Sequence, residues 1–270
     1  MLYQVTDWDD AYVNGAYIPN ADSYLPHWAE AAAAFRASHP SERTGDGDRQ
    51  GHLFRPEGQP RGLMVFIHGG YWMRFHPDDW SHLAAGALAA GWACLMPGYH
   101  LAPEARIADM GRQVAAQIAD AAAGIAGPIA ICGHSAGGHL AARMVCAGGP
   151  LPEEVAARVT ACLPISPLTD LRSLMRTGMN ATLQIDAAEA AAESPALLEP
   201  RPGLPVTAWV GGAERPEFLR HARLLADAWA GLGAPTRLVV DPGRHHFDVI
   251  DPLARPGSAM LRCLLEGLSP

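Results

Sequence analysis

Short apolar runs recur along the chain from residue 63 onward and predict the strands of a buried sheet. These runs are Leu63–Ile67, Trp92–Met96, Ile129–Cys132, Val159–Ile165, Val206–Val210 and Arg237–Val240. Their apolar residues mostly follow one another directly instead of alternating with polar ones, which is typical of strands covered on both faces. A parallel sheet inside an α/β protein contains strands of this kind.

Helical patterns separate the apolar runs. They cover Pro77–Ala90, Glu104–Ala123, Ala136–Ala147, Glu217–Leu232 and Pro252–Leu268. Strands that alternate with helices indicate an α/β fold in which helices cover both faces of a mostly parallel sheet. The sequence therefore predicts that fold class.

The pattern also predicts how the chain is organised. Residues 1–60 are rich in tyrosine and proline, with one helical stretch at His27–Ser38, and are expected to form an N-terminal arm packed on the main fold. Residues 61–270 are expected to form one domain, because 270 residues can fold as a single α/β unit. The longer break at about residues 168–204 is expected to be a small cap over a site.

Composition removes several classes of function. The net charge of −8 argues against a nucleic-acid partner, which requires a concentrated basic surface. All 20 basic residues are arginines, so no lysine is present for a Schiff base, a pyridoxal-phosphate site or a lysine-dependent nucleotide site. No uncharged apolar stretch reaches the ~18 residues that a membrane helix needs.

The cysteines and the N-terminus predict the compartment. The five cysteines are odd in number and show no CxxC spacing, as expected for reduced thiols. Residues 1–10 contain three aspartates and no basic residue, unlike a secretory signal. We therefore expect a cytoplasmic protein.

The clearest chemical motif is G-H-S-A-G at residues 133–137, between an apolar run and a helical pattern. G-x-S-x-G at a strand-to-helix junction indicates a nucleophile elbow, with Ser135 as the nucleophile. Gly133 and Gly137 are then required because the tight turn leaves no room for side chains. The backbone amide of Ala136, at the start of the helix, is expected to face a developing oxyanion.

A second motif, His68-Gly69-Gly70-Tyr71-Trp72, follows the first apolar run. Hydrolases with a nucleophile elbow take further oxyanion donors from this loop, and an HGG sequence is one known solution. We expect the amides of Gly70 and Tyr71 to be these donors, with His68 and Gly69 as supporting residues. Trp72 is open to two interpretations: it flanks the substrate, or it is a core residue that fixes the loop.

A serine nucleophile needs a base, which must come late in the chain. His246 is preferred over its neighbour His245, because Phe247 could pack against its ring. His221 lies in the middle of a helical pattern and is expected to be a surface residue.

The base in turn needs a carboxylate, expected after the strand at residues 206–210. Glu214 lies on the following loop and is preferred as the acid. Glu217 falls on the first turn of the next helix, where a carboxylate ordinarily stabilises the helix dipole. Asp170 comes one strand too early and is expected to shape its own loop.

Together these motifs resemble the kynurenine formamidase (arylformamidase) branch of the α/β-hydrolases. The resemblance rests on HGGYW, on GHSAGGHL and on the segments 214–218 and 246–251, and it extends from about residue 63 to residue 265, with a looser likeness in the N-terminal arm. It supports Ser135, Glu214 and His246 as a catalytic triad. Glu214 departs from the family pattern, which usually has aspartate at that position.

The resemblance implies hydrolysis of the formamide of N-formylkynurenine to kynurenine and formate, a step of tryptophan catabolism. In that reaction Tyr71 and Trp72 would flank the aromatic leaving group. A broad short-chain carboxylesterase with the same triad is the alternative, and a non-catalytic binding protein of this fold is less favoured. No cofactor and no metal are expected, because no metal-ligand spacing occurs among the 12 histidines. The partner is a small-molecule amide or ester, and a homodimer is left open.

Overall fold

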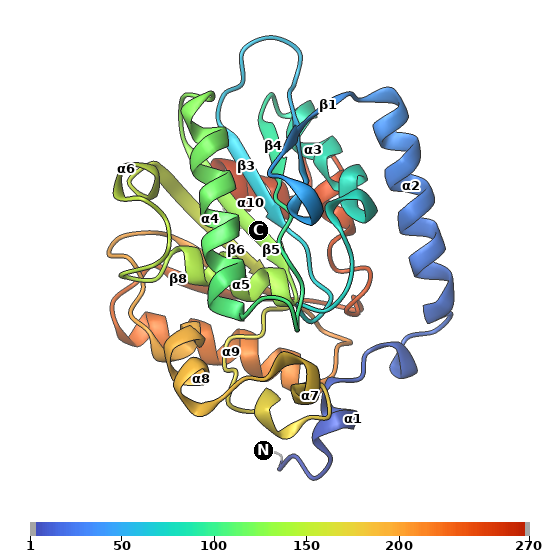
Figure 1. Cartoon of the computed structure of the whole chain (residues 1–270), viewed down its shortest axis with the longest axis vertical. Coiled ribbons are helices and arrows are strands. Elements are labelled where there is room, and N and C mark those ends of the chain that lie inside the picture. The colour runs from blue at the N-terminus through green and yellow to red at the C-terminus, as the bar shows by residue number, and fades with distance from the viewer. Residues whose placement is uncertain (1–3, 268–270) are drawn as a thin grey trace.

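The computed structural model describes residues 4–267, and its centre is a single eight-stranded sheet (Figure 1). The strand order is β1-β2-β4-β3-β5-β6-β7-β8. β1 and β2 run antiparallel to their neighbours, and the remaining pairs are parallel. The strands are β1 (Ser41–Thr44), β2 (Gly51–Phe54), β3 (Leu63–Ile67), β4 (Ala93–Met96), β5 (Ile129–His134), β6 (Val159–Ile165), β7 (Val206–Gly211) and β8 (Thr236–Asp241).

Helices lie on both faces of this sheet, which confirms the predicted fold class. The α-helices are α1 (Trp8–Tyr12), α2 (Tyr24–Ser38), α3 (Ala85–Ala89), α4 (Ile107–Ala123), α5 (Ala136–Met144), α6 (Glu153–Ala156), α7 (Asn180–Leu183), α8 (Ala187–Glu193), α9 (Pro216–Gly231) and α10 (Ala259–Glu266). The 3-10 helices are η1 (Gly15–Tyr17), η2 (Ala21–Ser23), η3 (Gly47–Arg49), η4 (Pro77–Ala84), η5 (Leu174–Arg176), η6 (Pro195–Leu197) and η7 (Asp251–Ala254).

The apolar strands divide the interior into two cores. Alternate residues of β3 enter opposite cores, with Val65 in the core under α4, α5 and α9, and Phe66 in the core under η4 and α10. Every residue of β3 is buried. The unbroken apolar runs of inner strands such as β3 thus follow from burial on both faces, whereas the edge strands β1 and β8 are partly exposed.

Predicted and observed elements agree closely in the main sheet. The strands β3 and β6 have the predicted bounds, β4, β5 and β7 differ from prediction by one or two residues at one end, and β8 is one residue longer at each end. The helical pattern at 77–90 is divided into η4 and α3, and the pattern at 252–268 into η7 and α10. Residue 268, the predicted end of the last helix, lies outside the described residues.

The first 60 residues contain more regular structure than the sequence predicts. The predicted helix at 27–38 is observed as α2, but β1 and β2 were not expected. They extend the sheet beyond β4, with His52 opposite Met96. The part of the arm that precedes them, α1 to α2, runs along the outside of the fold (Figure 1).

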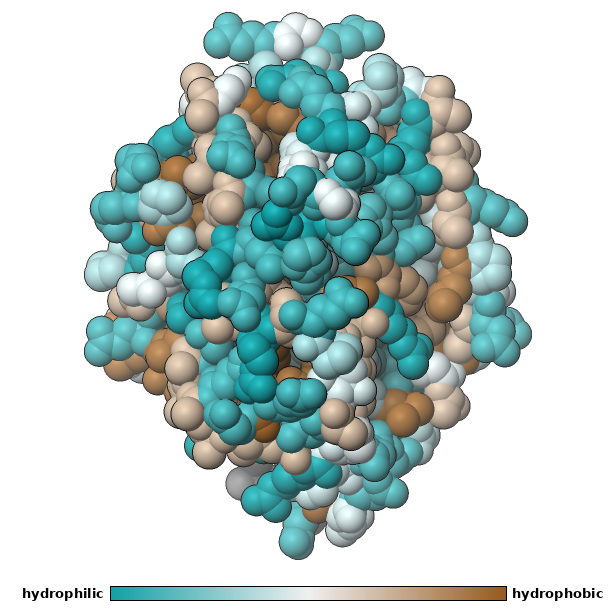
Figure 2. Space-filling model, in the orientation of Figure 1, coloured by the Kyte–Doolittle hydropathy of each residue, from teal (hydrophilic) through white to brown (hydrophobic). Residues whose placement is uncertain are grey.

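The surface that Figure 2 presents is mainly hydrophilic, and its hydrophobic residues lie in small separate areas. Among residues 4–267, no helix is both long and apolar enough to cross a membrane. All five cysteines are buried free thiols.

Candidate active site

Ser135 lies in the tight turn that joins β5 to α5. Its backbone has φ 56° and ψ −117°, a positive-φ conformation that is uncommon for a residue with a side chain. The turn is held by the Ser135 amide, which donates to the carbonyl of Ile165 on β6 at 2.8 Å. Such strain in a well-packed turn is typical of a functional position.

The glycines of this turn are required by close backbone packing. A Cβ on Gly133 would clash with the carbonyl of Gly137, and a Cβ on Gly137 would clash with the carbonyl of Ile67 at the end of β3. Ala136 is the first residue of α5, so its amide has no acceptor within the helix. An oxyanion formed at Ser135 would therefore meet the positive end of α5.

His246 and Glu214 form a buried hydrogen-bonded pair. Nδ1 of His246 lies 2.6 Å from Oε2 of Glu214, and both residues are less than 10% exposed. Glu214 follows β7 and His246 follows β8, so neighbouring parallel strands bring them to the same edge of the sheet. With Nδ1 held by the carboxylate, Nε2 of the imidazole is left to act as a base.

Two donors fix the other oxygen of this carboxylate. Oε1 of Glu214 accepts the amide of Gly211 at 2.8 Å and the hydroxyl of Ser166. Both oxygens of the Glu214 carboxylate therefore have assigned partners, and its orientation toward His246 is determined. Ser166 was not singled out by the sequence.

The His246 ring is held by different neighbours than expected. The ring centroid of Phe218 on α9 lies 4.3 Å away and that of His134 lies 4.5 Å away, whereas Phe247 is at 6.3 Å. Phe247 instead packs against Trp28 of the arm, at 5.3 Å. Burial lowers the pKa of His134 well below its ordinary value, so this neighbour adds no positive charge beside His246.

The loop after β3 has a positive φ at three consecutive positions, which glycine adopts freely but which is strained at Tyr71 and Trp72. Gly70, Tyr71 and Trp72 have φ values of 106°, 52° and 57°. The carbonyl of Gly70 accepts the amides of both Met73 and Arg74 at 3.0 Å, which closes the loop into a tight turn. Gly70 and Tyr71 line the same cavity as Ser135, so this turn brings the two predicted donors to the site.

The supporting residues at the start of this loop are buried. The imidazole of His68 stacks on Tyr99 with ring centroids 4.4 Å apart, and the Tyr99 hydroxyl donates to the His68 carbonyl at 2.8 Å. A Cβ on Gly69 would press against the backbone of His134 and the side chain of Ser135. These contacts hold the loop against the elbow.

Trp72 does not line the cavity. Its side chain is fully buried and packs edge-on against His139, with ring centroids 5.1 Å apart. The interpretation of Trp72 as a substrate-binding residue is therefore wrong. Its left-handed backbone turns the indole into the core, where it supports the loop, while Tyr71 lines the cavity.

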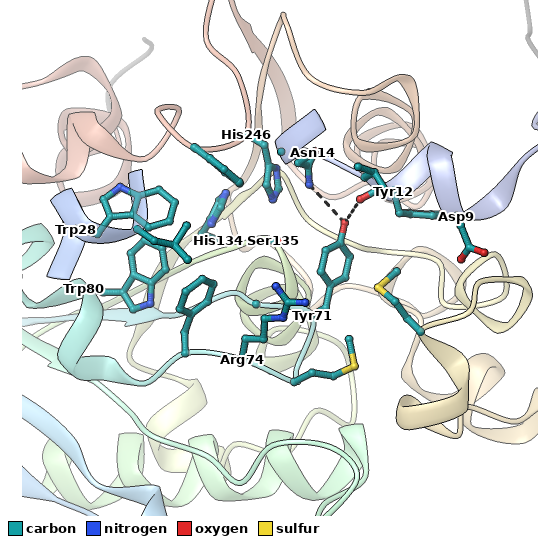
Figure 3. Close-up of a pocket in the computed structure, with 18 residues that line it drawn as sticks. Asp9, Tyr12, Asn14, Trp28, Tyr71, Arg74, Trp80, His134, Ser135 and His246 are labelled. Carbon is teal, nitrogen blue, oxygen red and sulfur yellow. Dashed lines mark hydrogen bonds between the residues drawn. The ribbon is translucent and has the colours of Figure 1, made fainter. Parts of the chain in front are cut away.

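A cavity of ≈ 420 Å³ opens over Ser135 and His246 (Figure 3). Four aromatic residues that touch one another line part of it, and we call them the aromatic cluster: Trp28, Phe75, Trp80 and Phe247.

Figure 3 shows Trp28 and Trp80 on one side of His246, and Asn14, Tyr71 and Asp9 on the other. The cavity thus has an aromatic side and a more polar side.

Much of the cavity wall comes from the N-terminal arm, which the sequence did not place there. Tyr12, Asn14 and Trp28 line it, and the Tyr71 hydroxyl donates to the carbonyl of Tyr12 at 2.6 Å. From the predicted cap, Met179 also lines the cavity. The clustering of tyrosine and tryptophan in the first 30 residues was the available signal for a packed wall.

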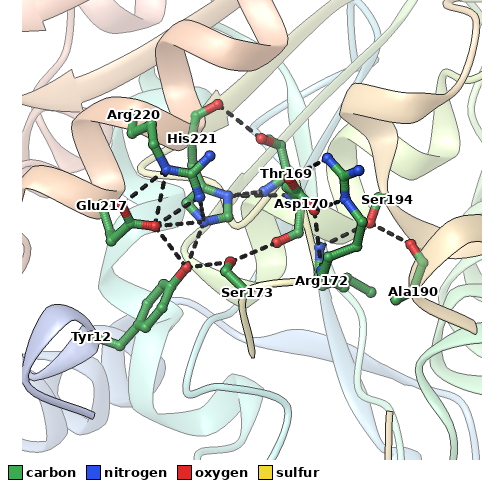
Figure 4. A network of polar contacts seen from close by, with 11 residues as sticks. Tyr12, Thr169, Asp170, Arg172, Ser173, Ala190, Ser194, Glu217, Arg220 and His221 are labelled. Carbon is green, nitrogen blue, oxygen red and sulfur yellow. Dashed lines mark hydrogen bonds and ion pairs between the residues drawn. The ribbon is translucent and has the colours of Figure 1, made fainter. Parts of the chain in front are cut away.

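A buried polar network fixes the arm to the main fold (Figure 4). The hydroxyl of Tyr12 lies 2.5 Å from Ser173 Oγ, 2.8 Å from His221 Nε2 and 3.1 Å from Glu217 Oε2. Glu217 is itself paired with Arg220 at 2.7 Å. The carboxylate of Glu217 is thus a structural group of the arm contact.

His221 was expected at the surface, and this expectation is wrong. The residue is fully buried, and its Nδ1 accepts the amide of Thr169 at 2.9 Å. Burial lowers the pKa of His221 to about 3, so the ring is neutral and can accept this bond. Nδ1 also accepts the amide of Asp170 at 3.2 Å, and the Asp170 carboxylate binds Arg172, so Asp170 shapes its own loop.

His245, the histidine that was not preferred as the base, has other partners than Glu214. Its Nε2 lies 3.1 Å from the hydroxyl of Tyr24, and its Nδ1 lies 3.1 Å from Asp248. Among the residues described, no group of three or more histidine, cysteine, aspartate or glutamate side chains is arranged to hold a metal ion.

Comparisons with known proteins agree with this geometry. A family described as the alpha/beta hydrolase fold matches residues 64–248. Kynurenine formamidases from Danio rerio and Salmo salar are both 26% identical to this chain, covering 76% of it and 72% of their own length. These relatives confirm the resemblance to the arylformamidase branch.

A solved structure is more similar still. A protein from Silicibacter sp. TM1040, which carries a provisional thioesterase name, is 49% identical and superposes with a TM-score of 0.91. The match covers 96% of this chain and 98% of that one. It includes the N-terminal arm, so the arm belongs to the shared architecture.

Proposed function

Because the chain belongs to the alpha/beta hydrolase fold family, we propose that it is a serine hydrolase that cleaves an aryl formamide such as N-formylkynurenine. One observation carries the serine mechanism: His246, buried and paired with Glu214, lines the same cavity as Ser135, which sits on a strained elbow. The similarity to kynurenine formamidases supports the formamide as substrate.

In the first half of the reaction, Ser135 Oγ attacks the formyl carbon while Nε2 of His246 takes its proton. Glu214 holds the imidazole in the required tautomer and stabilises the imidazolium that forms. The tetrahedral oxyanion accepts hydrogen bonds from the amides of Gly70, Tyr71 and Ala136. Each such donor is worth about 3 kcal/mol of transition-state stabilisation.

The C–N bond then breaks, and His246 returns the proton to the departing arylamine. This leaves a formyl ester on Ser135. A water molecule, deprotonated by the same imidazole, attacks the ester carbonyl, and formate leaves as the proton passes back to the serine oxygen. One water is consumed, and one amine and one formic acid are released.

The shape of the cavity supports a small acyl group and an aromatic leaving group. Formyl is the smallest acyl group, so most of the ≈ 420 Å³ is available to the leaving part of the substrate. The aromatic cluster offers apolar surface for an aryl ring, and its members Trp28 and Trp80 pack against each other with ring centroids 4.7 Å apart. Tyr71 lines the polar side of the same space.

The test is the ratio of kcat/KM for N-formylkynurenine to that for p-nitrophenyl acetate. We expect the formamide to be hydrolysed at least as efficiently as the activated ester. An ester preference of several orders of magnitude would reject the formamidase proposal and leave the serine mechanism in place.

A broad short-chain carboxylesterase or thioesterase is the second candidate. The 49% identical protein with a thioesterase name favours it, because the same triad cleaves esters and thioesters. Turnover of acetyl and butyryl thioesters, measured beside the formamide, separates the two candidates. A cytoplasmic location and a possible homodimer stay predictions from the sequence.

A further inference from the structure

Arg74 places a positive charge on the wall of the candidate active site. It is the only arginine among the described residues that line the cavity over Ser135. Figure 3 shows its guanidinium beside the ring of Tyr71, directed toward the side of the cavity where Ser135 and His246 lie. Arg74 is exposed, so a ligand in the cavity can reach its side chain.

The backbone of Arg74 belongs to the same turn as the proposed oxyanion donors. Its amide donates to the carbonyl of Gly70 at 3.0 Å, and a Cβ on Gly70 would clash with the Arg74 carbonyl. The position from which the guanidinium extends is therefore fixed relative to the reacting carbon. A charged group on the substrate would be held at a defined distance from the bond that breaks.

The guanidinium of Arg74 has no carboxylate or carbonyl acceptor among residues 4–267. Arg215, which lies near the arm, differs: its guanidinium binds the Asp10 carboxylate and stacks 3.6 Å over the Tyr17 ring.

Asp9 is the acidic residue of the cavity wall, but its Oδ1 accepts the Gly178 amide at 2.6 Å, on the far side of Tyr71 (Figure 3). Arg74 is thus left available to a ligand.

We propose that Arg74 binds a carboxylate on the leaving group, so that the preferred substrates are anionic aryl amides whose ring lies against the aromatic cluster. This inference rests on the proposed function. A guanidinium binds a carboxylate through two parallel hydrogen bonds, which fixes direction as well as distance. A local positive charge is also needed because the chain carries a net charge of −8, which disfavours the approach of an anion.

The test uses two product-like arylamines that differ only in charge: 3-(2-aminobenzoyl)propanoate and its neutral primary amide, 3-(2-aminobenzoyl)propanamide. Their dissociation constants are measured by calorimetry, so the result does not depend on turnover. We expect the wild-type protein to bind the propanoate about tenfold more tightly than the propanamide. High salt should reduce this preference, because an exposed ion pair is screened.

Arg74→Gln should bring the ratio of the two constants close to one, and Arg74→Lys should retain part of the preference. Arg223→Gln is the matched control, because Arg223 is an exposed arginine on α9 that does not line the cavity. A wild-type ratio near one, no binding of either compound, or an unchanged ratio in Arg74→Gln would overturn the inference.

The formyl derivatives of both compounds are assayed in parallel for release of formate. Absence of formate from both would count against the proposed formamidase function, whereas the binding ratio would still report on Arg74. The two failures are therefore distinguishable.

Discussion

The hydroxyl of Tyr12 lies 2.8 Å from Nε2 of His221, although 209 residues separate them in the chain. This contact joins the N-terminal arm to α9, the helix that also supplies Phe218 against the ring of His246. The backbone carbonyl of Tyr12 accepts the Tyr71 hydroxyl at 2.6 Å. One residue of the arm is thus connected both to the loop of the proposed oxyanion donors and to the helix behind the proposed base.

Tyr12→Phe should destabilise the protein by about 1–3 kcal/mol, because His221, Glu217 and Ser173 would lose a buried hydrogen-bond partner. Urea unfolding measures the change. Tyr17→Phe is the control: the Tyr17 hydroxyl also binds a carboxylate, that of Asp10, but in an exposed position. Equal losses of stability in the two variants would show that the Tyr12 network does not secure the arm.

The main sheet was predictable because both of its faces are buried. Runs such as those in β3 and β6 are apolar at nearly every position, and their short length and β-branched residues favour a buried strand over a segment of a buried helix. β1 and β2 were missed because they are four residues long and contain polar residues. β2 joins the sheet by pairing with β4, a contact distant in the sequence, and β1 pairs in turn with β2.

In the candidate site, too, some residues could be predicted from local pattern, whereas others depend on contacts distant in the sequence. Ser135, Glu214 and His246 were selected because the order of strands and loops restricts where each type of residue can stand. The structure brings Glu214 and His246 into contact and places Ser135 on the same cavity. The burial of His221 depends on Tyr12, and the orientation of Trp72 depends on a left-handed backbone, so neither could be derived from local pattern.

Glu214→Asp should lower kcat/KM by about 10- to 100-fold, although aspartate is usual at this position in the arylformamidase family. A carboxylate shortened by one methylene cannot keep the Gly211 amide at 2.8 Å and His246 Nδ1 at 2.6 Å together. Steady-state kinetics measures the change. Glu153→Asp, at an exposed ion pair with Arg201, is the control and should retain wild-type activity. Full activity of Glu214→Asp would reject this orienting role.

Ser166→Ala should lower kcat by about tenfold, since a charge-assisted hydrogen bond to Glu214 Oε1 is worth about 1.5–3 kcal/mol. The effect should fall on kcat more than on KM, because Ser166 acts through Glu214 and does not line the cavity. A change confined to KM would contradict this assignment.

Gly137→Ala should destabilise the fold by several kcal/mol, because the added Cβ clashes with the carbonyl of Ile67 and the backbone must move. Gly231→Ala is the matched control: Gly231 ends α9, and a Cβ there meets no atom within 4 Å. The control should be neutral or slightly stabilising, as a helical glycine replaced by alanine. Thermal unfolding of both variants tests the prediction, and similar midpoints would refute the close packing at the elbow.

Buried histidines should make the protein less stable in mild acid. Burial lowers the pKa of His68 and His139 to about 4 and that of His221 to about 3, against an ordinary value of 6.5. Between these values and pH 6.5, the three histidines bind protons in the unfolded chain but not in the folded one. Their neutral burial therefore contributes its full free energy of unfolding above pH 6.5, and this contribution decreases as the pH falls. Each of the three imidazole rings should lower the free energy of unfolding by about 1 kcal/mol between pH 7.5 and pH 5.5.

Urea unfolding at pH 7.5 and pH 5.5 measures this loss. Carboxylates contribute little in that interval, because unfolded aspartate and glutamate titrate near pH 4. Equal free energies of unfolding at the two pH values would mean that these histidines are not buried as described.

The most direct test of the central claim is covalent labelling with a fluorophosphonate, read by peptide mass spectrometry. An activated serine attacks phosphorus and displaces fluoride, so the account predicts one stable adduct on Ser135 of the wild-type protein. Ser135→Ala should remove the adduct, and His246→Ala should slow its formation by several orders of magnitude. An unlabelled Ser135, or labelling at an undiminished rate without the imidazole of His246, would contradict the account.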